Sequence, residues 1–140
     1  MIRTKRVYDA PVPEDGVRFL VERLWPRGMK KANVPMDDWC KDVAPSDALR
    51  RWFAHDPTKW ETFQHRYFAE LDSKPEAWRP VLEATQRGTV RLLYSARDRE
   101  HHNAVALQRY LERVLGTEGA EDVASSGCDQ RSLVGAFLSA

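Results

Sequence analysis

The sequence predicts one small α/β domain in which helices flank a sheet that is at least partly parallel. Segments with the composition of β-strands alternate with segments that have the spacing of amphipathic helices across residues 2–115. Toward the end of this region the expected buried strand 90–94, a short polar loop and a helix follow one another, which is half of a βαβ unit. The 140 residues are enough for a single hydrophobic core.

Three segments near the start of the chain are expected to be strands. Residues 2–8 are rich in β-forming side chains and precede a stretch of prolines, acids and glycine that is typical of a turn. Residues 17–25 alternate between two faces, and Pro26 and Gly28 stop this second strand. Residues 38–43 are expected to form a third, shorter strand.

Two helix starts are marked in the middle of the chain. Ser46 follows a proline and is expected to cap a short helix with its side-chain oxygen. Asp56-Pro57 is a stronger signal, because Asp56 suits the cap and proline at the first helical position lacks only an N–H that would have no partner within the helix. In the helix that follows, large side chains recur at helical spacing and are expected to face the core: Trp60, Phe63, Tyr67 and Leu71.

The remaining segments complete the α/β pattern. We expect a helix over 76–87 with Gly88 at its C-terminal cap, a buried strand over 90–94, and a last helix after a polar loop. The composition then shifts to glycine, serine, alanine and acidic residues, which is typical of a linker. The chain is therefore divided into an α/β domain, 1–115, and a linker with a short C-terminal extension, 116–140.

Charge and composition argue against several classes of function. The 22 basic and 21 acidic side chains leave a formal net charge of +1, so nucleic-acid binding has to rest on a local patch such as Arg27, Lys30 and Lys31. No apolar run is long enough to cross a bilayer and no signal-peptide segment begins the chain, so we expect a cytoplasmic protein without a membrane partner. Cys40 and Cys128 lie far apart, which fits neither a disulfide framework nor a zinc site.

The first candidate site is built around Arg23. The strand pattern places its guanidinium on the apolar face, at the carboxyl-terminal end of the second strand. An unpaired charge there costs several kcal/mol, whereas a charge-assisted hydrogen bond returns about 1.5–3 kcal/mol, so a partner is required. The partner is either a carboxylate, with Asp98 and Asp38 as candidates, or an anionic ligand in a cavity shared with Arg27. The sequence leaves both alternatives open.

The second candidate site is the segment from Tyr94 to Asp98, between a buried strand and the start of the last helix. Ligands collect at such junctions, because strand ends open a crevice and unpaired helix N–H groups attract anions. Asp98 equally suits a helix cap. Ser95 as a nucleophile needs a base such as His101, and the sequence has no G-x-S-x-G elbow. The catalytic residues stay unknown, with Tyr94, Ser95 and Asp98 as the candidates.

Four motifs occur together in this chain: K-R-V-Y-D at 5–9, V-E-R-L-W-P-R-G at 21–28, Trp39 with A-P-S at 44–46, and L-L-Y-S-A-R-D at 92–98. In this combination they resemble the YeaO-like branch of domain of unknown function family 488, over residues 1–115. The resemblance implies no particular activity. It implies one cleft at an end of the sheet, shared by Arg23, Trp25, Arg27, Ser46, Tyr94, Ser95 and Asp98.

Three functions are compatible with these observations. The preferred one is binding of a small phosphate- or carboxylate-bearing ligand at the carboxyl-terminal ends of the strands, with catalysis left open. The alternatives are a nucleic-acid-associated or regulatory accessory protein and a non-catalytic interaction module. We expect no cofactor and no metal, and the oligomeric state is left open. The expected ligand-binding residues are Arg23, Trp25, Arg27, Ser46 and Ser95.

Overall fold

The computed structural model describes residues 1–125, with side chains through Gly116. Of the linker and extension expected over 116–140, the part beyond residue 125, including Cys128, lies outside the described residues. The chain divides into two compact units, Met1–Gln108 and the part from Arg109 onward, and the sheet and pocket discussed below belong to the first. Within the described residues, no helix has both the length and the apolar character needed to span a bilayer.

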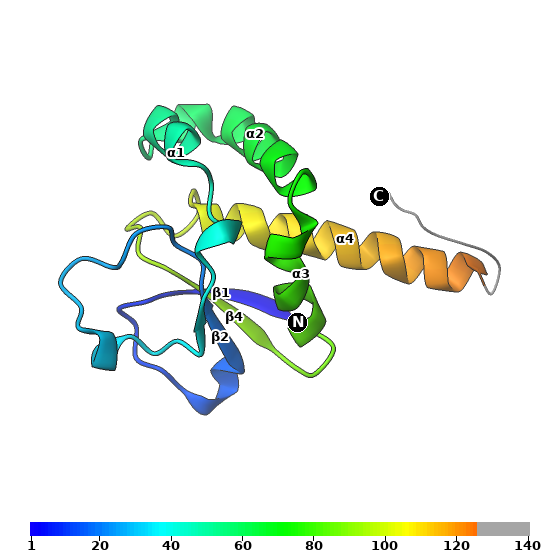
Figure 1. Cartoon of the computed structure of the whole chain (residues 1–140), viewed down its shortest axis with the longest axis horizontal. Helices are drawn as coiled ribbons and strands as arrows, with labels where there is room; N and C mark the ends of the chain where they lie inside the picture. The colour runs from blue at the N-terminus through cyan, green and yellow to red at the C-terminus, as the bar shows by residue number, and fades with distance from the viewer. Residues whose placement is uncertain (126–140) are drawn as a thin grey trace. The chain divides into compact units, whose positions relative to one another are not determined.

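A four-stranded parallel sheet forms the centre of the first unit. The strands are β1 (Ile2–Arg6), β2 (Val17–Leu20), β3 (Asp38–Trp39) and β4 (Val90–Tyr94). Their order is β1-β4-β2-β3, and each neighbouring pair is parallel. β4 therefore lies between β1 and β2, as Figure 1 shows. This arrangement confirms the predicted α/β class.

The first two α-helices begin where the sequence places their caps. The α-helices are α1 (Asp47–Phe53), α2 (Trp60–Asp72), α3 (Pro75–Ala84) and α4 (Asn103–Ser125). The Ser46 hydroxyl accepts a hydrogen bond from the Leu49 N–H at 3.2 Å and caps α1. Asp56 accepts one from the Thr58 N–H at 3.0 Å and starts the 3-10 turn Pro57–Lys59 that leads into α2. Both predicted helix starts are confirmed.

The aromatic stripe of α2 faces the core, as predicted. All four of its large side chains are buried, and the Tyr67 hydroxyl donates a hydrogen bond to the Val43 carbonyl. Phe53 of α1 stacks on Phe63 with ring centroids 4.3 Å apart. This contact joins α1 to α2 and builds one wall of the candidate site.

The second strand ends at Leu20 rather than at residue 25. Phe19, Leu20 and Val21 are all buried, because both faces of this parallel sheet are covered at the carboxyl-terminal end of β2. One further backbone bond, from the Val21 N–H to β4, ends the pairing. The alternation over 22–25 therefore belongs to a connection, and Arg23 does not lie on a strand face.

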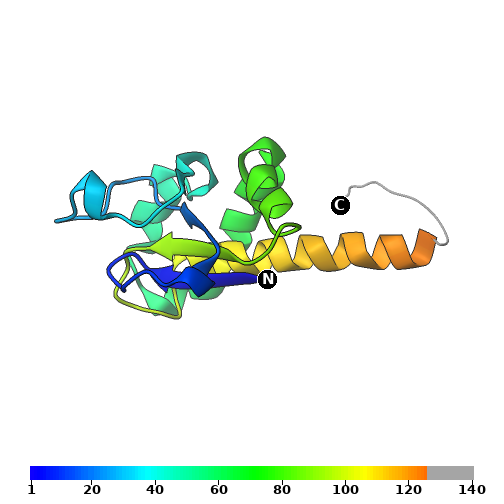
Figure 2. The ribbon, with the colours of Figure 1, turned by 90° about the horizontal axis from the view of Figure 1, so that it is seen from below.

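The connection from β2 to β3 covers the face of the sheet on which Leu20 and Leu93 lie. It lies beyond the carboxyl-terminal ends of the strands in both Figure 1 and Figure 2. Its apolar side chains close over a small buried cluster, which holds this end of the sheet together without an α-helix, since the connection contains only the 3-10 turn Lys31–Asn33. The cluster is Val7, Leu20, Val34 and Leu93, with Trp25, Met29, Met36 and Trp39 packed against it.

Three smaller expectations are wrong. Residues 38–43 form only a short strand and the 3-10 turn Lys41–Val43. α3 ends at Ala84 and has Thr85 as its C-cap, so Gly88 is not the cap. α4 continues through Ser125, where the composition predicts a linker from residue 116.

The connection from β1 to β2 is tied to the sheet by Asp15, which is 1% exposed. Its carboxylate accepts Lys5 Nζ at 3.0 Å and Arg18 Nε at 3.1 Å, and Arg91 Nε lies 3.5 Å away. Burial raises the pKa of Asp15, but the Val12 N–H and the two nearer cations outweigh burial and hold it at about 2. Because the cations come from β1, β2 and β4, one carboxylate links three strands.

Candidate functional site

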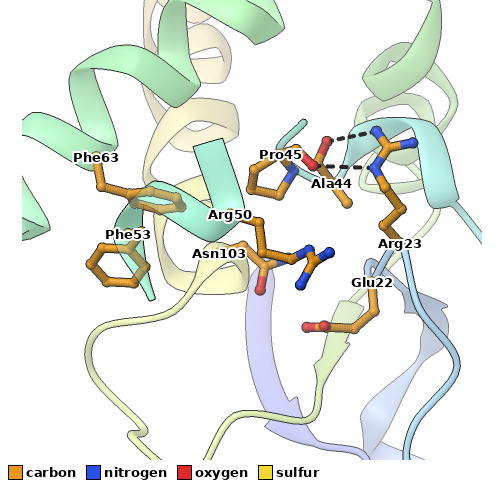
Figure 3. A pocket seen from close by; sticks show the side chains of 8 residues that line it. All are labelled: Glu22, Arg23, Ala44, Pro45, Arg50, Phe53, Phe63 and Asn103. Atoms are coloured by element: carbon orange, nitrogen blue, oxygen red, sulfur yellow. Dashed lines mark hydrogen bonds between the residues drawn. The ribbon is translucent and has the colours of Figure 1, made fainter. Parts of the chain in front are cut away.

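A pocket of about 40 Å³ opens where the chain leaves β2 (Figure 3). Two of its lining residues lie just after the end of β2. Others come from α1 and α2 or from the segment before α1, and the last is the first residue of α4. Polar and apolar side chains both face it. They are Glu22, Arg23, Ala44, Pro45, Arg50, Phe53, Phe63 and Asn103.

Glu22 is the chemically unusual group of this pocket. Its Oε1 accepts a hydrogen bond from the Ser95 hydroxyl at 3.5 Å. Its Oε2 is buried and has no hydrogen-bond partner among the described residues. Leaving a buried acceptor unsatisfied costs about 1–3 kcal/mol. The carboxyl group is therefore short of one donor, which points to a proton or a ligand at this position.

Burial also raises the pKa of Glu22 to about 7, because the ionised form loses its hydration. The backbone N–H and hydroxyl of Ser95 and the charge of Arg50 oppose this rise without cancelling it. Figure 3 shows the Arg50 guanidinium directed toward the Glu22 carboxyl group. No ion pair within 4.0 Å joins the two in the described chain.

Arg23 lines the pocket but holds the backbone rather than an acid. Its Nε donates to the Pro45 carbonyl at 3.2 Å and its Nη2 to the Ala44 carbonyl at 3.4 Å. The Lys74 ammonium donates to the same Ala44 carbonyl at 3.3 Å. Of the two partners left open for Arg23, an ion pair with Asp98 or Asp38 does not occur in the described part of the chain, because β2 ends early and turns Arg23 toward the segment that enters α1.

Arg27 and Trp25 lie on the β2–β3 connection and do not line the pocket. Arg27 is exposed, and its carbonyl accepts the Tyr8 hydroxyl at 3.0 Å. The Trp25 indole donates to the Met29 carbonyl at 2.7 Å and meets the Trp39 ring edge-on at 5.1 Å. The hollow expected between Arg23 and Arg27 is instead formed by Arg23 and Arg50. A nucleic-acid role for the exposed basic run around Arg27 stays a prediction.

Ser46 positions the helix that carries Arg50 and lies outside the pocket lining. In addition to capping α1, its hydroxyl donates to Glu70 Oε2 at 2.6 Å and its backbone N–H donates to Glu70 Oε1 at 2.9 Å. Its capacity for hydrogen bonds is thus used within the protein. Ser46 fixes the start of the helix that carries Arg50, and it is not itself a pocket residue.

Tyr94 and Asp98 have structural partners of their own. The buried Tyr94 ring stacks on His102 with centroids 3.5 Å apart, and burial raises its pKa. Asp98 accepts the Glu100 and His101 N–H groups and contacts His101 Nδ1 at 2.9 Å, which caps the turn before α4. Hydrogen bonds from the Glu100 N–H and from the ring and N–H of His101 lower the pKa of Asp98 to about 2. Asp98 is therefore a poor proton donor near neutral pH.

The sequence reasoning missed Glu22, Arg50 and Asn103. Asn103 donates its side-chain N–H to the Val21 carbonyl at 2.7 Å, which brings the start of α4 to the end of β2. The sequence marked only the segments that carry two of them. Glu22 lies inside the motif around Arg23, and Arg50 lies one turn into the helix that Ser46 caps.

Comparison with known proteins places the chain in a family. The family DUF488-N3i, described as "Inactive DUF488-N3 subclade", matches residues 1–129. The chain belongs to the DUF488-N3i family. This confirms the resemblance to the YeaO-like branch of DUF488. The family match continues past residue 115, where the motif resemblance was expected to end.

Two relatives of this DUF488-N3i chain are similar over most of their length. One is "Uncharacterized protein YeaO" of Escherichia coli (strain K12), 37% identical over 110 residues, which are 79% of this chain and 96% of that protein. The other is "Uncharacterized protein Rv3073c" of Mycobacterium tuberculosis (strain ATCC 25618 / H37Rv), also 37% identical over 110 residues, with 92% of its length covered. No solved structure matches the chain.

Proposed function

We propose that this chain is a non-catalytic binding protein that holds a small carboxylate- or phosphate-bearing anion in the pocket between Glu22 and Arg50. The observation that carries the proposal is the buried, unpartnered Glu22 Oε2 in a pocket lined by two guanidinium groups. The word "Inactive" in the description of the family supports binding without chemistry.

The electrostatics of the pocket favour an anion. With Glu22 neutral, Arg23 and Arg50 give the lining two positive charges and no negative one. Arg23 has two of its N–H groups fixed on carbonyls, so its charge is held in place before a ligand arrives. Arg50 shares its charge with exposed Asp47 at 3.3 Å and keeps the rest of its planar donor fork. A hydrogen bond from such a group to an anion contributes about 1.5–3 kcal/mol.

Arg50→Gln tests this proposal, with Arg51→Gln as the matched control. Both arginines are exposed on α1, and only Arg50 lines the pocket. Thermal unfolding of the full chain is measured at pH 6 against rising sodium phosphate and sodium acetate, at constant ionic strength. An anion at ten times its Kd stabilises the natural chain by about 1.4 kcal/mol.

The expected result is that Arg51→Gln keeps this anion-dependent rise in Tm and Arg50→Gln loses it. Equal rises in the two variants would place the anion elsewhere on the surface. No rise in the natural chain with either anion would remove the proposed function.

A further inference from the structure

The pocket has a polar end and an apolar end. Figure 3 shows Glu22 on one side, the Phe53 and Phe63 rings on the other, and Arg50 with Asn103 between them. Both rings are buried, at 4% and 2% exposure, and they stack on one another. An inorganic anion would use only the polar end. A ligand that fits the whole pocket has a charged head and an apolar chain.

The size of the pocket limits both parts. A volume of about 40 Å³ corresponds to about three water-sized positions on the same measure. This space suits a planar carboxyl group with one or two carbons attached. Inorganic phosphate has no apolar part for the phenylalanine end, and the tetrahedral head group of a phosphate ester is bulkier than a planar carboxyl group.

Glu22 decides in which protonation state a carboxylate can bind. Two ionised carboxylates in contact repel, so only one of them can carry a charge. Ser95 already serves Oε1, and Oε2 is the buried atom without a partner. A single proton between Oε2 and a ligand oxygen satisfies this atom, and the ligand's second oxygen is left for the Arg50 guanidinium.

We propose that the pocket takes a small monocarboxylic acid with a short apolar chain, which binds together with one proton shared between its carboxyl group and that of Glu22. This inference rests on the proposed anion site and names its ligand class. No bond other than the hydrogen bond forms, and when Glu22 is ionised beforehand the proton comes from the buffer acid in the solvent.

The groups around Glu22 define the pH range. Arg23 follows it in the chain, Arg50 faces it from α1, Tyr67 from α2, and Ser95 from the segment after β4. Of these groups, Arg50 and Ser95 favour the ionised form and burial opposes it, which leaves the pKa at about 7. In the protein without ligand, the Glu22 carboxyl group is thus mainly protonated at pH 6 and mainly ionised at pH 8.

Isothermal titration of the full chain with sodium propionate tests the inference. Each titration is run at pH 6 and pH 8, in two buffers of different ionisation enthalpy, so that the difference in heat gives the number of protons taken up. We expect close to one proton per propionate at pH 8 and close to none at pH 6. The apparent affinity should be about tenfold weaker at pH 8, because only the protonated fraction binds.

Glu22→Gln supplies the donor without the titration, and Glu61→Gln changes an exposed carboxyl group of α2 as the control. Glu22→Gln should bind propionate equally at both pH values with no proton uptake, and Glu61→Gln should behave as the natural chain. Propionate binding without proton uptake at pH 8 in the natural chain would overturn the inference, even if Glu22→Gln failed to fold. Binding of phosphate but not propionate would overturn it and leave the proposed function standing, whereas binding of neither would end both.

Discussion

Replacing Asp15 by alanine is expected to lower the free energy of unfolding by about 3–5 kcal/mol, the usual cost of removing one partner from a buried ion cluster. Asp15 is the only carboxylate among the ion pairs of Lys5, Arg18 and Arg91 in the described chain. Without it, three cations whose side chains are only 16–21% exposed repel one another across three strands. Urea unfolding at pH 7 measures the loss.

The matched control is Glu14→Ala, which removes an exposed acid from the same 3-10 turn, Pro13–Asp15. This change should lower the unfolding free energy by less than about 0.5 kcal/mol. Similar losses for the two substitutions would show that loss of overall negative charge, and not the buried cluster, is responsible.

The same carboxylate gives the fold an acid dependence. The pKa of Asp15 is about 2 in the folded chain and about 3.9 in an unfolded one. Its contribution to stability is therefore complete above about pH 4 and lost as the pH falls toward 2. The difference in unfolding free energy between the natural chain and Asp15→Ala should shrink over this range. A constant difference would contradict the assignment.

Gly16→Ala is the second substitution with a large expected effect. It should lower the free energy of unfolding by about 2–6 kcal/mol. Gly16 has φ of 74°, which a side chain rarely adopts, and a Cβ there would lie 2.1 Å from the Thr89 carbonyl oxygen. Strain and overpacking each cost about 1–3 kcal/mol. The Thr89 carbonyl also accepts the Val17 N–H at 3.0 Å, so any shift disturbs the first pairing of β2 with β4.

Gly28→Ala separates the two causes. Gly28 has a similar φ of 78°, but nothing lies within 4 Å of the position its Cβ would take. Gly28→Ala should lower the free energy of unfolding by about 1 kcal/mol, because only the backbone conformation is strained. Equal losses at Gly16 and Gly28 in chemical denaturation would mean that the close approach to Thr89 is relieved at no cost.

Much of the fold follows from local signals. The caps at Ser46 and Asp56 and the aromatic stripe of α2 depend on side chains within one or two turns, and the structure has them as predicted. The strand 90–94 is bounded by a glycine and a polar loop, and β4 has these same limits. Where a segment carries its own start and stop signals, the sequence alone is sufficient to predict the element and its limits.

The candidate site depends on contacts between distant segments, which is why only part of it was predicted. The alternation over 17–25 fits a half-exposed strand, but the β2–β3 connection covers that face and ends the strand at Leu20. This change moves Arg23 to the pocket and Arg27 to the surface. Arg50 joins the site only because α1 folds back beside Glu22, and no local pattern encodes that approach.

The most direct test of the anion site is an NMR titration of the ¹⁵N-labelled full chain with sodium propionate at pH 6, following the arginine Nε–Hε and asparagine side-chain signals. We predict saturating shifts of the Arg50 Nε–Hε and Asn103 amide signals, which report the middle of the pocket, between Glu22 and the phenylalanine rings. Shifts that grow linearly without saturation, or that are confined to exposed groups such as Arg27, would contradict the account.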